Sequence, residues 1–265
     1  MPRARSPDTD AVSALVRGFQ VLDCFASALR PLGNGDVAAA TGIPKASVAR
    51  LIGTLQTLGH LRPAAERERY ELAPGVMRLA EAFLAGLDLR AVVRPHLQAL
   101  SEATGCSAFL GVRDGAEMLV VEAGRARSAV AVMGADIGTR MALDTSSLGR
   151  AWLAGVDEPT RRLALGAQPG PALLAALALA QQRGHALSLG EWHPAIVAAA
   201  VPLRTPRGEV VSLNCGSPTA VVSAQRLQQE VLPRLHAMAD AIAAEIGGLA
   251  GLALTNPEAS GVSPR

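Results

Sequence analysis

The stretch GDVAAATGIPKASVARLIGTLQTLGHL, from Gly35 to Leu61, predicts two short helices joined by a tight turn. The first helix is rich in Ala and Val, which allow close packing, and Gly42 supplies the left-handed position that ends it. Pro44 suits the first position of the second helix, where its missing amide hydrogen costs nothing. The pair follows the helix-turn-helix plan, in which the second helix enters the major groove of DNA.

The second helix has two unlike faces. One face is an apolar stripe formed by Val48, Leu51, Ile52, Leu55 and Leu58. The other face has small residues and the candidate DNA contacts Lys45, Ser47, Arg50 and Thr57. A helix that enters a groove needs small residues for close approach and a few donors for phosphates and base edges. The alternative is an ordinary amphipathic helix with a solvated polar face.

The flanking residues favour the DNA-binding interpretation. A preceding helix begins near Ser13, its expected N-cap, and places Leu15, Phe19, Leu22 and Phe25 on one apolar face. A turn over residues 31–35 ends this helix. After Gly59, two short strands at residues 60–62 and 70–72 predict a hairpin, which completes a winged helix. Arg67 and Arg69 on this wing are candidate phosphate contacts, and the alternative is a hairpin tip of mixed charge without a ligand.

Composition and charge bound the classes of function. The chain has 265 residues, of which 49% are hydrophobic and 18% charged, and its net charge is +2. Residues 1–75 carry nine basic and seven acidic side chains, whereas residues 76–265 carry sixteen of each. So small an excess predicts modest affinity per copy and therefore two or more copies on DNA. The sequence shows no secretory signal and no apolar run of membrane-spanning length, so we expect a cytoplasmic protein without a membrane partner.

Four blocks in the N-terminal part carry a family resemblance. They are Arg17-Gly18-Phe19-Gln20-Val21-Leu22, Thr41-Gly42-Ile43-Pro44-Lys45, Arg50-Leu51 with Leu55, and Tyr70-Glu71-Leu72. Together they resemble the DNA-binding domain of the IclR family of bacterial transcriptional regulators. The family usually has Ser-Thr after the Lys, whereas this chain has Ala46-Ser47, so one hydroxyl is missing. Arg17, in the first block, is a further candidate DNA contact.

After residue 105 the hydrophobic period changes from helical to strand-like. Strands are expected at residues 106–113, 117–123 and 130–133, with a strand or loop at 138–143. Helices follow over 148–154, 158–165 and 172–183, then strands over 185–189, 196–203 and 209–214, and a last helix over 224–246. This order predicts an α+β domain with a mainly antiparallel sheet covered by helices.

The C-terminal half also resembles the IclR family, in its GAF-like effector-binding domain. The matching blocks are Gly138-Thr139-Arg140, Gly149-Arg150-Ala151, Arg183-Gly184-His185-Ala186, Gly190-Glu191-Trp192, Ala199-Ala200-Val201-Pro202 and Leu213-Asn214-Cys215-Gly216. The fold class is therefore α+β, with an N-terminal winged helix-turn-helix, a bridging helix and a C-terminal GAF-like antiparallel sheet with flanking helices.

This organisation divides the chain into five parts. A disordered tail covers residues 1–12, the winged-helix domain 13–73, linker and dimerisation helices 74–104, the effector-binding domain 105–250 and a second disordered tail 251–265. The linker is expected to break near Leu84–Asp88, where Gly86 weakens the helix. An exposed apolar side on the linker would pair two copies, and we expect a homodimer or a homotetramer.

The candidate effector site begins at Thr145-Ser146-Ser147, whose hydroxyls and free amides precede a helix from Leu148. A helix N-terminus suits an anion such as a carboxylate, and simple capping is the alternative. The resemblance adds contacts from the last strands, which gives Ser146, Ser147, Leu148, Ser188, Trp192, Ala198, Asn214, Cys215 and Ser217 as candidates. A register shift of one residue through Asn214–Ser217 would turn these side chains to the other face.

Two alternatives use the three cysteines and five histidines. Cys215 could act as a nucleophile with His193 or His185 as its base, in a cysteine-dependent GAF-like enzyme. The thiols or imidazoles could instead make the chain a thiol- or metal-sensing regulator. No pair of these residues has the local spacing of a metal site, and no catalytic motif is present. We therefore expect a regulator that is not an enzyme and needs no cofactor or metal. It would bind operator DNA and an effector such as a small aromatic acid or a short aliphatic oxoacid.

Overall fold

The computed structural model describes residues 12–126, 135–166 and 168–247. The chain divides into two compact units, residues 1–83 and 84–265, which are described separately. The predicted strand at 130–133 and the predicted tails, apart from Val12, lie outside the described residues. No helix among the described residues is long and apolar enough to cross a membrane.

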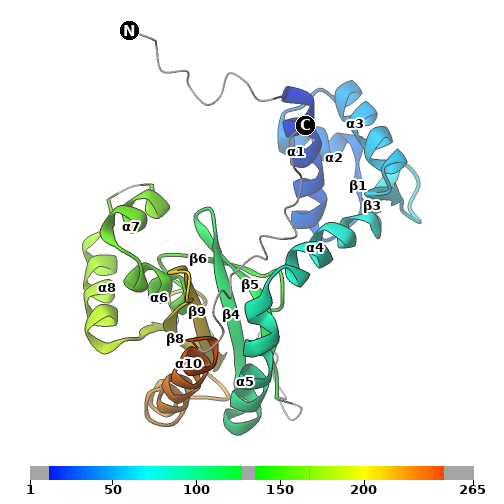
Figure 1. The fold of residues 1–265 in the computed structure, drawn as a ribbon. Helices are drawn as coiled ribbons and strands as arrows, with labels where there is room; N and C mark the ends of the chain where they lie inside the picture. Colours follow the sequence, from blue (N-terminus) through cyan, green and yellow to red (C-terminus); the bar gives the residue numbers. More distant parts are fainter. Residues whose placement is uncertain (1–11, 127–134, 167, 248–265) are drawn as a thin grey trace. The chain divides into compact units, whose positions relative to one another are not determined.

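The first unit is a winged helix (Figure 1). Its elements are α1 (Ser13–Ala28), β1 (Leu32–Gly33), α2 (Asn34–Thr41), α3 (Lys45–Thr57), β2 (Leu61–Pro63), β3 (Arg69–Leu72) and most of α4 (Gly75–Ala85). The three strands form an antiparallel sheet in the order β1-β3-β2. The hairpin of β2 and β3 confirms the predicted wing. Strand β1 lies where the sequence predicted only a turn, because Leu32 pairs with Tyr70 and places its side chain in the core.

The core of this unit corrects the predicted face of the first helix. Val21 and Phe25 are buried, whereas Leu15 and Phe19 are 61% and 54% exposed. The predicted stripe is therefore right for Phe25, and for Leu22, which packs against the core, but wrong for Leu15 and Phe19. The helix also begins differently, because Val12 occupies the N-cap position and Ser13 is already helical. Apolar residues from α1, α2, α3 and the sheet complete the core: Val21, Phe25, Leu32, Val37, Ile43, Val48, Ile52, Leu55 and Leu61.

The linker breaks where the sequence predicted. Helix α4 ends at Ala85 and α5 covers Asp88–Thr104, with Gly86 and Leu87 between them. Helix α5 continues through Pro95. At the start of α4, a β-carbon on Gly75 would lie 2.1 Å from the carbonyl oxygen of Gly59, so only glycine allows this close approach.

The second unit is a six-stranded antiparallel sheet with helices on both faces. After α5 its elements are β4 (Ser107–Asp114), β5 (Glu117–Gly124), β6 (Arg140–Ala142), α6 (Ser147–Gly155), α7 (Glu158–Leu165), α8 (Pro171–Arg183), β7 (Ala186–Leu189), β8 (Ile196–Arg204), β9 (Val210–Pro218), α9 (Ala224–Arg226), a π-helical turn (Leu227–Val231) and α10 (Leu232–Gly247). The strand order is β6-β5-β4-β9-β8-β7. This arrangement confirms the predicted α+β class.

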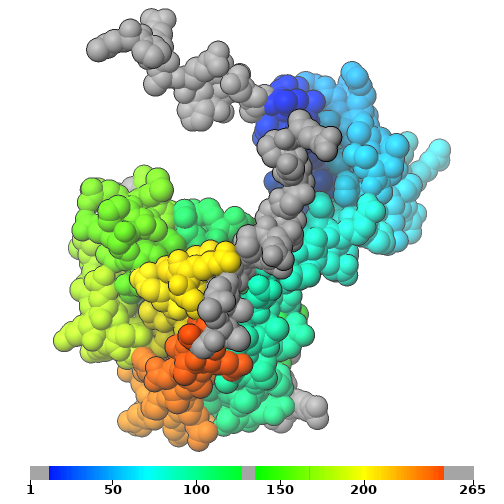
Figure 2. Space-filling model, viewed as in Figure 1, coloured from blue at the N-terminus to red at the C-terminus, as the bar shows by residue number. Residues whose placement is uncertain are grey.

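The two faces of the sheet have separate cores (Figure 1). Helices α5 and α10 cover one face, where Leu97, Leu213 and Ile242 are buried. Helices α6, α7 and α8 cover the other, where Phe109, Leu148 and Leu177 are buried. In Figure 2 the side chains of α7 and α8 form a continuous surface along one side of this unit. Because the two cores are separate, candidate effector residues can form one site only if their side chains lie on the same face of the sheet.

Candidate functional site

The outer face of α3 carries two cations, Lys45 and Arg50, that have no partner among the described residues. Val48, Ile52 and Leu55 are buried and hold the helix against the core, so that Lys45 and Arg50 are exposed. Neither side chain makes a hydrogen bond or an ion pair within the described parts of the chain. A basic side chain without an internal partner is free to meet phosphate or a base edge.

The remaining candidate DNA contacts on the helices differ in their exposure and in whether their polar groups already make internal hydrogen bonds. Arg17 is exposed on α1, and Ser47 is half-buried. Thr57 is exposed, but its hydroxyl donates to the carbonyl of Gly53 at 3.1 Å. A DNA contact through Thr57 would therefore use its oxygen as an acceptor.

The wing separates two arginines that the sequence treated alike. Arg67 is exposed and has no ion pair among the described residues. Arg69 instead contacts Asp36 at 2.9 Å, the carbonyl of Pro31 at 3.1 Å and Glu66 at 2.9 Å. The pKa of Asp36 is lowered, first by the amide of Gly33 that donates to it and then by Arg69. These contacts give Arg69 a structural role that ties the wing to α2.

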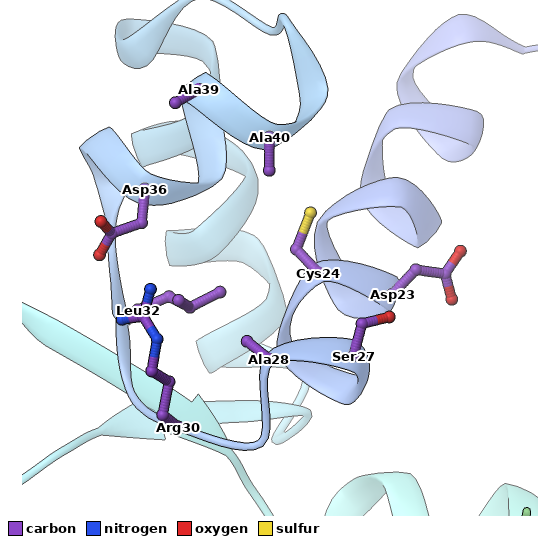
Figure 3. A pocket seen from close by; sticks show the side chains of 9 residues that line it. All are labelled: Asp23, Cys24, Ser27, Ala28, Arg30, Leu32, Asp36, Ala39 and Ala40. Atoms are coloured by element: carbon purple, nitrogen blue, oxygen red, sulfur yellow. The ribbon is translucent and has the colours of Figure 1, made fainter. Parts of the chain in front are cut away.

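The first unit also has an open groove between α1 and α2 that the sequence did not predict. Its volume is about 680 Å³, and Figure 3 shows Cys24 of α1 and Ala40 of α2 on its walls. The charged lining residues are Asp23, Arg30 and Asp36. None of the candidate DNA contacts lines this groove, and its mixed charge does not suit a phosphate backbone.

Ser146 and Ser147, at the N-terminus of α6, do different things. Ser146 is the N-cap: its hydroxyl accepts from the amide of Gly149 at 3.0 Å and donates to the carbonyl of Ala142 at 2.6 Å. The hydroxyl of Ser147 accepts from Nδ2 of Asn214 at 2.8 Å. For Ser146 the capping alternative is therefore correct, and for Ser147 the structure shows a contact with the last strand.

Polar groups at this end of α6 remain available. The amides of Ser147 and Leu148 have no acceptor among the described residues, as is usual for the first turn of a helix. Both Asn214 and Ser147 are 2% exposed, yet Oδ1 of Asn214 has no hydrogen-bond partner in the described part of the chain. A buried amide oxygen without a partner is costly, and a ligand that donates to it would remove that cost.

Small residues of the sheet lie on the same face. Register pairs Ser188 with Ala198, Ala198 with Gly216, and Gly216 with Ser107. Trp192 is half-buried in the core on this face, and its amide donates to the hydroxyl of Ser188 at 3.3 Å. Leu148 is fully buried, and a β-carbon on Gly111 would lie only 3.1 Å from it. Leu148 thus packs on β4 at Gly111, four residues along the strand from Ser107 in the small-residue row.

The structure places Cys215 on the other face of the sheet. It lies in the core with α5 and α10, beside Thr104 and Cys106. Ser217 follows two residues later on the same strand and therefore has the same orientation, and its partner Val197 is in the same core. The prediction that Cys215 and Ser217 line the effector site is therefore wrong. On this strand it is Gly216 that lies on the same face of the sheet as the other candidates, which are Asn214, Ser147, Leu148, Ser188 and Ala198.

The cysteine chemistry considered from the sequence lacks a catalytic arrangement. A hydrogen bond with Cys215 lowers the pKa of Cys106 to about 7, and the same hydrogen bond, followed by burial, raises the pKa of Cys215. His193 is exposed and accepts from the amide of Ala195, and His185 contacts His236. Within the described ranges, no group of three or more His, Cys, Asp or Glu side chains could hold a metal ion.

Comparison with known proteins agrees with this architecture. Residues 14–64 match the family described as the IclR helix-turn-helix domain, and residues 81–244 match the one described as the bacterial transcriptional regulator IclR C-terminal domain. The chain therefore belongs to the IclR family of bacterial transcriptional regulators. Its family and relatives are regulators of transcription and not enzymes.

Individual relatives support the same assignment. The HTH-type transcriptional regulator TsaQ1/TsaQ2 of Comamonas testosteroni is 34% identical over 154 residues, which are 58% of this chain and 54% of that protein. The Pca regulon regulatory protein of Pseudomonas putida is 27% identical over 164 residues, which are 62% of this chain and 56% of that protein. The matched stretch thus spans little more than half the length of these curated relatives.

Solved structures share the fold over most of the chain. An IclR-family transcriptional regulator from Brucella abortus is 34% identical, with a TM-score of 0.77 over 90% of this chain and 94% of that one. An IclR homolog complexed with 4-hydroxybenzoate, from Microbacterium hydrocarbonoxydans, is 23% identical, with a TM-score of 0.71 over 89% of this chain and 99% of that one.

Proposed function

We propose that this chain binds operator DNA through α3 and that a small carboxylate held at the N-terminus of α6 controls the affinity. The observation that carries the first half is the pair of unpartnered cations, Lys45 and Arg50, on the exposed face of a winged helix. We assign Arg50 to a base edge, because its guanidinium can donate two hydrogen bonds, and Lys45, at the start of the helix, to a phosphate. Arg17, Ser47, Thr57 and Arg67 are secondary contacts, and Arg69 is structural.

Fluorescence anisotropy with duplexes from the region upstream of the gene for this chain tests the DNA-binding proposal. We expect one duplex to bind at least roughly 10³-fold more tightly than a scrambled duplex, with affinity falling steeply as salt rises. Equal affinity for both duplexes would contradict it. The duplex that binds is called the operator below.

The second half of the proposal rests on the polar groups around Ser147. The free amides of Ser147 and Leu148 suit a carboxylate. Oδ1 of Asn214 needs a donor, which a hydroxyl on the same ligand would supply. Ser188, Ala198 and Gly216 are small enough to leave room for a flat ligand on this part of the sheet. These features favour a small hydroxy acid, and the relatives that bind 4-hydroxybenzoate or regulate a Pca regulon make a hydroxybenzoate a natural first probe.

A pair of matched ligands tests this assignment. 4-Hydroxybenzoate and benzoate differ only in the hydroxyl that would donate to Asn214. In a thermal-shift assay we expect 4-hydroxybenzoate to stabilise the protein more than benzoate does at the same concentration. At 100 times its Kd, 4-hydroxybenzoate should stabilise the protein by about 2.7 kcal/mol relative to the unliganded protein. Lactate and pyruvate form the corresponding pair of short acids. If no hydroxy acid stabilises the protein more than its matched partner, the role of Asn214 is wrong.

We further propose that the chain acts as a homodimer or homotetramer. Apolar side chains remain exposed on α4, where Met77, Leu79 and Phe83 are 54%, 62% and 42% exposed. An apolar surface of this kind is typical of a site that pairs with another protein. The small positive charge also favours two or more copies on one operator. Light scattering after size exclusion tests this, and a monomer at micromolar concentration would contradict it.

A further inference from the structure

Glu122 is a buried acid that the apolar pattern of β5 does not predict. Its side chain is 5% exposed and accepts from two arginines of α5. Arg90 contacts Oε2 of Glu122 at 3.0 Å, and Arg94 contacts the same oxygen through Nε at 3.1 Å and Nη2 at 3.0 Å. A buried carboxylate needs this degree of pairing, because its desolvation is expensive.

A β-bulge turns Glu122 towards α5. In the register of β4 and β5, Leu110 pairs with Glu122 and Gly111 pairs with Val120, so Val121 is the extra residue. Val120 lies in the core under α6, and strict alternation from it would place Glu122 on that same side. The bulge shifts the alternation by one residue and points the carboxylate at α5 instead.

Arg90 connects this carboxylate to the break in the linker. Its Nη1 donates to the carbonyl of Leu84, in the last turn of α4, at 3.2 Å. The amide of Leu87 also donates to this carbonyl, at 3.3 Å, and the amide of Arg90 donates to the carbonyl of Leu87 at 3.0 Å. Arg90 is only 13% exposed and bridges two acceptors that belong to the helix junction and to the sheet.

We propose that Arg90, held by Glu122 at the β5 bulge, is a positioning residue that fixes the junction of α4 and α5 to the effector sheet. This role rests on the proposed DNA-binding function, because the junction is where the chain leaves the effector-binding unit towards the winged helix. The bulge also adjoins Gly111, on which Leu148 packs. The pair of β4 and β5 therefore has the candidate effector site on one face and the contacts of Arg90 with Glu122 on the other. A change at the sheet can then alter the direction of the linker.

Arg94 provides a matched control one helical turn away. It binds the same carboxylate, but its side chain is 61% exposed and has no contact with α4 among the described residues. The variants Arg90→Lys and Arg94→Lys both keep a positive charge beside Glu122. Only Arg90→Lys removes the planar fork that serves Glu122 and the Leu84 carbonyl together.

Hydrogen exchange and operator binding of the full chain test the proposal. In Arg90→Lys we expect the backbone amides of residues 86–91 to exchange about tenfold faster, as expected when one charge-assisted hydrogen bond is lost. Operator affinity should fall roughly fivefold or more, while affinity for a scrambled duplex stays the same. Arg94→Lys should leave both exchange and operator affinity as in the wild type.

Three outcomes would overturn the positioning role. One is unchanged exchange in Arg90→Lys, and the second is an equal effect of the two variants, which would reduce both arginines to general stabilisers. The third is faster exchange with unaltered operator affinity. If the wild type binds no duplex, the proposed function fails instead, and the exchange measurement still decides whether Arg90 orders the junction.

Discussion

The outer face of α3 and the N-terminal end of α6 carry polar groups in opposite surroundings. Lys45 and Arg50 are exposed and have no partner in the described chain, whereas Ser147 and Asn214 are buried and bonded to each other. Long charged side chains in water can adapt to a large partner such as DNA. Short polar groups held in an apolar core can select a small molecule by the few hydrogen bonds that they leave open.

The packing of each helix explains this contrast. Helix α3 contacts its core through one stripe, so its other face stays in solvent. Helix α6 is buried almost throughout, and a β-carbon on Gly149 would lie 2.3 Å from the Cα of Leu143. A substitution on the exposed face of α3 should therefore change binding without changing stability, while a single substitution of a buried side chain on α6 should change both.

Leu148→Ala should have the largest effect, because it removes a fully buried side chain from α6. We expect the free energy of unfolding in urea to fall by about 2–5 kcal/mol. The space created beside Gly111 should also admit bulkier carboxylates in the thermal-shift assay. Leu163→Ala is the control, since Leu163 is 78% exposed on α7 and should change stability by at most about 0.5 kcal/mol. Equal losses in the two variants would show that Leu148 is not part of the core.

Arg50→Ala should have the next largest effect, on binding alone. Loss of one base contact should weaken operator binding by about 1–3 kcal/mol per copy and relax the sequence preference. The free energy of unfolding should stay within about 0.5 kcal/mol of the wild type. Arg62→Ala is the control, because Arg62 is an exposed arginine that is already paired with Glu71 at 2.8 Å. The reading role of Arg50 fails if both variants bind the operator equally well.

The sequence predicted the parts of the molecule that depend on local patterns. Apolar spacing predicted the buried residues of α3, although Leu58 of the predicted stripe lies past the end of the helix and is 55% exposed. Paired short strands predicted the wing, and Gly86 marked the break in the linker. Each of these follows from neighbours within a few residues, such as a helical period or a turn residue.

Features that depend on distant partners were not predicted. Arg69 and Asp36 lie 33 positions apart, and nothing near either residue signals their ion pair. The face of the sheet on which Cys215 lies depends on the register of β9, and the sequence pattern leaves that register uncertain by one residue. The bulge at Val121 reverses the side on which Glu122 lies, and it is visible only once β4 and β5 are paired.

At the buried N-terminal end of α6, the double variant Ser147→Ala/Asn214→Leu should separate the effect on stability from the effect on ligand binding. It removes both partners of the 2.8 Å hydrogen bond together with the unpartnered oxygen. Replacing both polar groups by apolar ones should leave the free energy of unfolding within about 1 kcal/mol, or raise it slightly. The stabilisation by 4-hydroxybenzoate should disappear. Asn214→Leu alone leaves Ser147 without its donor, and stabilisation that persists in the double variant would place the ligand elsewhere.

The smallest effects should come from the wing. Its two arginines, Arg67 and Arg69, allow an exposed cation to be compared with a paired one within a single hairpin. Arg67→Ala removes an exposed cation that has no ion pair within the described ranges, so it should weaken all duplexes alike and reduce the salt slope by roughly 1 per copy. The melting temperature should not change. Arg69→Ala removes the contacts to Asp36, Glu66 and the Pro31 carbonyl, so it should lower the melting temperature before it alters binding.

The pH dependence of the Arg69 effect provides a further check. The folded-state pKa of Asp36 is lowered, first by the Gly33 amide and then by Arg69, so its stabilising contribution is present above the unfolded pKa. This contribution is lost as the pH falls through the lowered folded pKa, where the carboxylate becomes protonated. The difference in melting temperature between wild type and Arg69→Ala should therefore be full at neutral pH and shrink in acid. A difference that is constant from neutral pH to strong acid would assign the effect to the Pro31 carbonyl rather than to the carboxylates of Asp36 and Glu66, because the carbonyl does not titrate.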